Sequence, residues 1–133
     1  MDFIENTEIA TTPIDAADAK SLAEAIAEVL DSKKARDIKV LYVEDKTVIA
    51  EYFVVCTGNS STQVKALADE VVYQMGLCGV ECLRSEGYDT ATWILLDFGS
   101  IIVHVFQKDA RNYFKLEKLW ADAEEINIDS IIG

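Results

Sequence analysis

The stretch that decides the fold of this chain is residues 93–106, which read Trp93-Ile-Leu-Leu-Asp97-Phe-Gly99-Ser-Ile-Ile-Val103-His104-Val-Phe106. Two runs rich in β-branched, aliphatic and aromatic residues flank a short break that contains glycine. This pattern predicts strands over residues 92–97 and 101–106, joined as a hairpin that turns at Phe98-Gly99.

Side chains alternate across a strand, so the hairpin has two faces of different character. The aliphatic face is expected in the core and consists of Ile94, Leu96, Ile101, Val103 and Val105. The mixed face carries an acid, the only histidine and a tryptophan; its members are Trp93, Leu95, Asp97, Ile102, His104 and Phe106. A two-residue turn would pair Asp97 with Ser100, Leu95 with Ile102, and Trp93 with His104.

The elements around this hairpin predict a single α/β domain. We expect a helix over residues 15–31 with Asp15 as its N-cap, strands over 38–43 and 47–56, a helix that carries Val64 to Met75, a strand over 80–84, and a C-terminal helix over 111–123. The order is αββαβββα, which predicts a mixed sheet of about five strands with flanking helices. Residues 1–13 are expected to form a loose arm, residues 14–125 the domain, and residues 126–133 a tail.

The composition narrows the classes of partner. Twenty-four acidic residues face twelve basic ones, for a formal net charge of −12. This charge repels phosphate backbones, so naked nucleic acid is not an expected ligand, whereas a basic protein surface is. The three cysteines lack a paired spacing and indicate reduced thiols, and neither a membrane span nor a targeting segment is evident. We therefore expect a cytoplasmic protein.

Two features could carry chemistry. Gly58-Asn59-Ser60-Ser61 follows a strand and opens a helix, where backbone amides can hold a phosphate. The alternative, which we favour, is a turn with a serine N-cap in which Gly58 supplies a positive φ. A nucleotidyltransferase would also need a pair of acids on the next strand to hold metal ions, and none follows. His104 lacks a neighbouring nucleophile, so we expect no catalytic residue, metal or cofactor.

The two tryptophans have different expected roles. Trp120 follows Tyr113 and Leu116 at helical spacing, which favours a core position. Trp93 lies on the mixed face, where core packing and an interface anchor are equally compatible with the pattern.

Several longer motifs carry a family resemblance, over roughly residues 16–123. They are Lys34–Ile38, Tyr52–Ser61, Glu86-Gly87, Trp93–Gly99, Val103–Phe106, Arg111–Tyr113 and Leu116–Trp120. Through them the chain resembles the ribosomal silencing factors, also called the Iojap family. It departs from the family pattern at Glu51, Phe98, Ser100 and Phe114, which changes only hydroxyl or charge contacts.

The resemblance implies a nucleotidyltransferase-like fold without known catalysis. It implies binding to the large ribosomal subunit through a basic protein of the intersubunit face, the universal fourteenth large-subunit protein. The bound factor would block joining of the small subunit and repress translation; the free protein can form a homodimer. Two alternatives stay open: a large-subunit assembly factor, and an enzyme that uses the Gly58–Ser61 turn. The expected partner-binding residues are Trp93, Leu95, Asp97, His104, Phe106, Tyr113 and Glu117.

Overall fold

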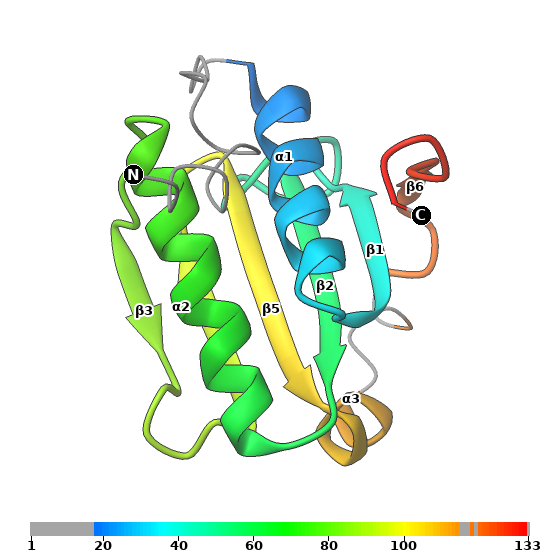
Figure 1. The fold of residues 1–133 in the computed structure, drawn as a ribbon. Helices are drawn as coiled ribbons and strands as arrows, with labels where there is room; N and C mark the ends of the chain where they lie inside the picture. Colours follow the sequence, from blue (N-terminus) through cyan, green and yellow to red (C-terminus); the bar gives the residue numbers. More distant parts are fainter. Residues whose placement is uncertain (1–17, 115–117, 119, 133) are drawn as a thin grey trace.

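The structure is a computed structural model that describes residues 18–132 except 115–117 and 119. Its elements follow one another as α1 (Ala19–Ser32), β1 (Arg36–Tyr42), β2 (Tyr52–Gly58), α2 (Ser61–Leu77), β3 (Arg84–Glu86), β4 (Trp93–Asp97), β5 (Ile101–Gln107), α3 (Lys108–Phe114) and β6 (Glu124–Ile126) (Figure 1). The described part of the chain is an α/β domain, as the sequence predicts.

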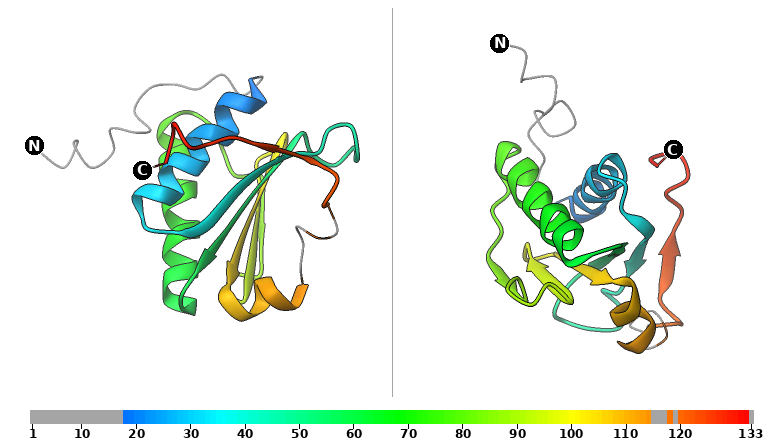
Figure 2. Two further views of the ribbon diagram at one scale, coloured as in Figure 1. Left: turned by 90° about the vertical axis from the view of Figure 1, so that its right-hand side faces the viewer. Right: turned by 60° about the horizontal axis from the view of Figure 1, so that its bottom comes forward.

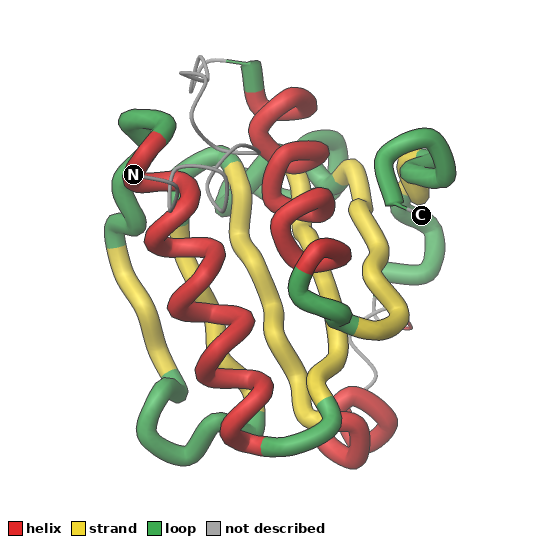
Figure 3. Tube along the Cα trace, in the orientation of Figure 1, coloured by secondary structure: helices red, strands yellow, loops and turns green. Residues whose placement is uncertain are grey.

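The strands form one mixed sheet in the order β3-β4-β5-β2-β1-β6. The central pair β2 and β5 is parallel, and the other neighbours are antiparallel. Both α1 and α2 lie across the same face of this sheet (Figures 1 and 3). Nearly every residue of β2 and β5 is buried, as expected for central strands covered on both faces.

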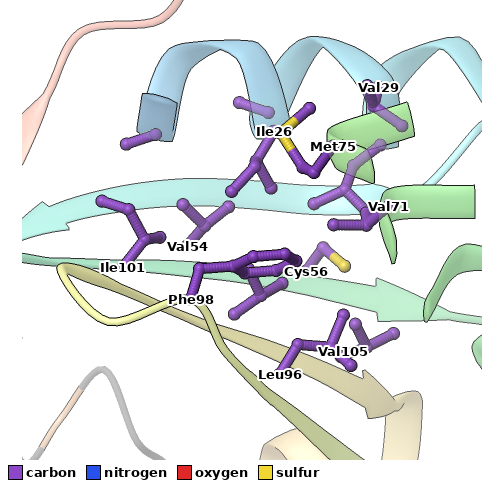
Figure 4. Packing of buried hydrophobic residues seen from close by; sticks show 14 of the residues in the cluster. Ile26, Val29, Val54, Cys56, Val71, Met75, Leu96, Phe98, Ile101 and Val105 are labelled. Carbon is purple, nitrogen blue, oxygen red and sulfur yellow. The ribbon is translucent and has the colours of Figure 1, made fainter. Parts of the chain in front are cut away.

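The larger core lies between the sheet and the helix pair α1 and α2. Figure 4 shows Ile26 and Val29 of α1 and Met75 of α2 packed over strand residues such as Val54 and Val105. In α1 the residues at helical spacing, Leu22, Ile26 and Leu30, have no exposed surface. Burial of this stripe therefore fixes α1 on the sheet.

A smaller cluster covers the opposite face of the sheet, the side on which α3 lies (Figure 2). Its buried members are Leu41, Val43, Ala50, Phe53, Val55, Ile102, Phe106 and Ala110. Trp93, Leu95, Trp120 and Ala123 pack against it and are partly buried. The residues that the structure describes thus cover the second face of the sheet only in part.

The β4–β5 hairpin confirms the predicted faces but not the predicted register. Trp93 pairs with Phe106, Leu95 with His104, and Asp97 with Ile102. The turn lies one residue later than expected, at Gly99-Ser100, because Gly99 supplies the left-handed backbone (φ +90°) and the Phe98 amide donates to the Ile101 carbonyl over 2.9 Å. A shift of two residues keeps each side chain on its face, so all the aliphatic-face residues lie in the core.

Other boundaries differ from the prediction. The α1 N-cap is Asp18, whose Oδ1 accepts from the Ser21 amide over 3.2 Å, while the expected cap Asp15 lies outside the described residues. The long second strand begins at Tyr52 instead of residue 47, since residues 43–51 form the loop between β1 and β2. The strand predicted over residues 80–84 is wrong; β3 spans Arg84–Glu86.

The C-terminal part also differs. The last helix begins at Lys108, three residues earlier than predicted, and a sixth strand follows it. This strand, β6, pairs with β1 through Val40 and Ile126, and Ile128 is only 6% exposed. Residues beyond the expected limit of the domain therefore pack onto the sheet. No helix in the described part of the chain has both the length and the apolar character needed to cross a bilayer.

Candidate functional site

The candidate site lies on β4 and its edge neighbour β3, on the sheet face that α1 and α2 leave uncovered. Ile94 and Leu96 point into the main core, while Trp93, Leu95 and Asp97 alternate with them and are each half-buried. We call these three residues the β4 patch. Alternation along a single strand thus provides a partly exposed tryptophan, leucine and aspartate.

Trp93 is held in one orientation by two contacts. Its indole Nε1 donates a hydrogen bond to Nδ1 of His104 over 3.0 Å. Its ring stacks on Phe106, with 4.8 Å between centroids and 28° between planes. A large side chain that is already ordered loses little conformational entropy on binding, which suits an interface anchor.

His104 is a buried supporting residue, only 4% exposed. Burial lowers the pKa of His104 from 6.5 to about 4, so the ring is neutral at pH 7. Because Nδ1 accepts from Trp93, the ring proton is on Nε2. Nε2 has no hydrogen-bond partner among the described residues, and the Phe53 ring meets the imidazole edge-on at 4.9 Å.

Two expected contact residues are therefore covered. His104 and Phe106, which is 0% exposed, cannot touch a partner without rearrangement of the residues above them. The mixed face of the hairpin was expected to be open, but Ala110, Trp120 and Ala123 pack on the cluster that contains Phe106. These two residues instead orient and support Trp93.

Charged side chains border the β4 patch on β3. Arg84 pairs in register with Asp97 and Glu86 with Leu95, which places both β3 residues on the patch face. The Arg84 guanidinium lies 3.2 Å from a Glu86 carboxylate oxygen and 3.8 Å from one of Asp97. Asp97 also accepts from the Gly99 amide over 2.8 Å, which fixes its carboxylate at the hairpin turn. Asp97 of the patch and the two β3 residues together form a charged border of two acids and one base.

The structure describes only some of the sequence candidates that follow β5. The side chains of Tyr113 and Glu117 lie outside the described residues. Trp120 is partly buried and meets Phe53 edge-on, with 5.3 Å between centroids and 90° between planes. Its packing agrees with the predicted structural role.

The Gly58–Ser61 turn is occupied by local hydrogen bonds. Ser60 Oγ accepts from the Gln63 amide over 3.1 Å, and Gln63 Oε1 accepts from the Asn59 amide over 2.6 Å. The predicted serine N-cap is confirmed. The predicted positive φ at Gly58 is wrong. Close packing is instead the reason for glycine there, because a Cβ would lie 2.9 Å from Val64 Cγ2.

Residues 16–132 match a protein-family model described as "Ribosomal silencing factor during starvation". The chain belongs to this family. It is 44% identical over 110 residues to the ribosomal silencing factor of Bacillus subtilis, an alignment that covers 83% of this chain and 93% of the relative. A more distant relative is the mouse "Mitochondrial assembly of ribosomal large subunit protein 1", 32% identical over 111 residues, with 81% of this chain and 49% of that protein covered.

Solved structures show the same fold as this silencing-factor chain. A crystal structure of a Chromobacterium violaceum protein superposes with a TM-score of 0.73 at 34% identity, covering 81% of this chain and 88% of that one. A Bacillus halodurans structure superposes with a TM-score of 0.69 at 37% identity, covering 84% and 98%. The family and the fold class predicted from the sequence are both confirmed.

Proposed function

We propose that this protein represses translation by binding the large ribosomal subunit and blocking its union with the small subunit. The observation that carries the proposal is the family match over residues 16–132. The docking partner is a basic protein of the intersubunit face, the universal fourteenth large-subunit protein, as the motif resemblance implies. Steric exclusion requires bulk and affinity at the right place, and neither step needs a covalent reaction.

The charge of the chain supports a basic protein as the partner. A formal charge of −12 attracts a basic surface and repels exposed RNA, so it favours the protein component of a ribosomal surface. At closer range, the rim acids Glu86 and Asp97 border the half-buried Trp93 and Leu95. An aromatic anchor with a charged rim is the usual anatomy of a protein interface.

The proposed contact residues are Trp93, Leu95 and Asp97, with Arg84 and Glu86 at the rim. Their position on one partly exposed face of β4 and β3 supports this choice. His104 and Phe106 act through Trp93. Tyr113 and Glu117 remain in the proposal because the sequence predicts them near this face of the sheet.

A second candidate function is assembly of the large subunit. It is favoured by the name of the mouse relative, which describes an assembly role. The two functions use the same docking surface and differ in outcome. Accumulation of large-subunit precursors in a deletion strain, with normal subunit joining in lysates, would favour assembly over silencing.

We place this action in the cytoplasm and propose that the free protein forms a homodimer, both by resemblance to the family. Sedimentation velocity across a concentration series measures the second property. A single species with the mass of one 14.8 kDa chain at every concentration would contradict the dimer.

Replacement of Trp93 by alanine tests the docking surface. Loss of an interface anchor commonly costs about 2 kcal/mol, so we expect Trp93→Ala to weaken binding to purified bacterial large subunits by about thirtyfold. The measurement is co-pelleting through a sucrose cushion across a range of protein concentrations.

The matched control is Tyr73→Ala, because Tyr73 is a 52%-exposed aromatic residue of α2, on the opposite side of the sheet. It should bind as the parent chain does. Circular dichroism confirms that each variant is folded. Unchanged affinity of a folded Trp93→Ala protein would show that the docking surface is elsewhere.

A further inference from the structure

A pocket with an unusual charge for this chain lies beside α3. It has a volume of about 460 Å³, and its described lining residues are Asp37, Lys39, Thr57, Lys108, Arg111, Asn112 and Lys118. We call it the basic pocket. Among these described residues four are basic and one, Asp37, is acidic, although acids outnumber bases two to one in the chain. The charge of the described lining is therefore opposite to that of the molecule.

The floor of the basic pocket is held in place by hydrogen bonds of Arg111. Arg111 is only 7% exposed, and its Nη1 donates to the Asp37 carbonyl over 2.6 Å and to Thr57 Oγ1 over 2.8 Å. The Asp37 carbonyl is reached at an irregularity of β1 between Arg36 and Lys39, where Asp37 has a φ of +51°. A bulge of this kind changes the direction of backbone groups. Here it turns the Asp37 carbonyl toward the Arg111 guanidinium.

The lining chemistry suits a phosphate group. Lysine, arginine, asparagine and threonine side chains all donate hydrogen bonds, and charge-assisted bonds to phosphate oxygens are strong and short. None of the described lining residues is aromatic, and none is leucine, isoleucine or valine. Among these described residues a nucleobase would find no such side chain to stack on, so this part of the lining favours an isolated phosphate over a whole nucleotide. The Lys39 ammonium also lies 3.8 Å from a carboxylate oxygen of Glu125, and both side chains are exposed. Glu125 therefore offsets part of the positive charge of Lys39.

The basic pocket opens on the same face of the sheet as the β4 patch. Thr57 of the pocket and Trp93 of the patch both pair in register with Phe106, one on each side of β5. They are therefore two strand spacings apart, or roughly 10 Å. A partner that contacts Trp93 brings its neighbouring surface up to the basic pocket.

We propose that the basic pocket binds a backbone phosphate of ribosomal RNA next to the ribosomal protein that the β4 patch contacts. The proposal rests on the proposed function, because docking through the β4 patch brings the neighbouring ribosomal RNA close to the basic pocket. The whole-molecule charge opposes binding of free RNA, and the pocket forms its contact only once the protein is held on the subunit. One surface thereby recognises a place where protein and RNA adjoin.

The test compares two double variants with the same change in net charge. Lys108→Gln/Lys118→Gln removes two cations of the basic pocket, and Lys20→Gln/Lys65→Gln removes two from α1 and α2. Affinity for large subunits is measured at several salt concentrations. Loss of one charge-assisted phosphate contact should weaken binding by the pocket variant about tenfold beyond the control, and reduce its salt slope by about 0.7–0.9.

A second arm identifies the source of the contact. Both variants should bind the isolated basic ribosomal protein as the parent chain does, because no RNA is present. Loss of that binding by the pocket variant would overturn the proposal, since the pocket would then contact protein. Equal affinities and equal salt slopes of the two variants on whole subunits would also overturn it, while leaving the proposed function intact. Failure of the parent chain to bind subunits would instead refute the proposed function itself, and the RNA contact with it.

Discussion

At the scale of single residues, the decisive pair is Trp93 and His104. The tryptophan is half-buried and reaches the surface, whereas the histidine beneath it is 4% exposed and accepts a hydrogen bond from the indole N–H over 3.0 Å. The only histidine of the chain thus serves to position an aromatic ring. Because His104 is buried, its positioning of Trp93 depends on pH: a charged imidazole inside the sheet costs free energy.

Acid should destabilise the protein through His104. The pKa of His104 is lowered from 6.5 in the unfolded chain to about 4 in the fold, so the unfolded state binds a proton first as the pH falls. Stability is therefore full above pH 6.5 and is lost progressively toward about pH 4. Between about pH 7.5 and about pH 5 we expect a loss of about 2 kcal/mol, measured by urea unfolding.

The His104→Gln variant isolates this contribution from that of the carboxylates. It is expected to be less stable at neutral pH, but its stability should change less with pH over the same range. If the parent chain and the variant lost the same free energy between the two pH values, burial of a neutral His104 would not be the cause.

At the scale of elements, the entry to α2 shows how tightly β2 and the helix meet. Gly58 ends β2, and a methyl group there would lie 2.9 Å from Val64 Cγ2 and 3.2 Å from the Val64 amide nitrogen. Gly76, in the last turn of α2, has no neighbouring atom within 4 Å of the same position. The glycine before α2 thus has no space for a larger side chain, whereas the glycine near the end of α2 does.

Alanine at these two glycines should have opposite effects. Gly58→Ala is expected to lower the free energy of unfolding by about 1–3 kcal/mol through overpacking. Gly76→Ala should raise it by up to about 1 kcal/mol, since alanine is the better helix former. Chemical denaturation measures both, and a stable Gly58→Ala protein would refute the close approach of β2 and α2.

Elements with a strong internal pattern could be predicted from the sequence, and weakly patterned ones could not. Alternation placed β4 and β5 within about one residue, and the aliphatic stripes of α1 and α2 located both helices. Every residue of the edge strand β3, Arg84-Ser85-Glu86, is exposed, and the strand carries no hydrophobic alternation. It forms because β4 offers unpaired backbone groups, which is a tertiary effect.

The same limit applies to the candidate site. Trp93, Leu95 and Asp97 could be predicted to share a face, because alternation along one strand requires it. The burial of His104 and Phe106 could not, since it depends on what packs over the sheet. The basic pocket brings together Lys39, Lys108 and Lys118 through a bulge and a helix. No local spacing in the sequence predicts that these lysines lie close together.

The strand β6 has a testable consequence for the C-terminal residues. Ile128 follows it and belongs to the main core at 6% exposure, although the sequence predicted a tail outside the domain there. Ile128→Ala should therefore cost about 2–4 kcal/mol of unfolding free energy. The 58%-exposed Ile49 provides the control: Ile49→Ala should change stability by less than about 0.5 kcal/mol. Equal, small effects would mean that the C-terminal residues do not pack on the sheet in solution.

At the scale of the whole molecule, the two faces of the sheet have separate tasks. One face buries the main core under α1 and α2, and the other presents a half-buried tryptophan with acids at its rim. The net charge of −12 directs such a molecule toward basic protein surfaces. If the protein acts as proposed, by occupying an interface, mutations can alter fold stability and docking separately.

The measurement that tests the central claim most directly is subunit joining on sucrose gradients. Purified large and small subunits are mixed at a magnesium concentration that normally forms whole ribosomes, with and without an excess of the protein. We predict that the protein sediments with the large subunit and that the joined-ribosome peak shrinks, and that Trp93→Ala restores it. A protein that travels with the large subunit while the joined peak stays unchanged would contradict the steric block.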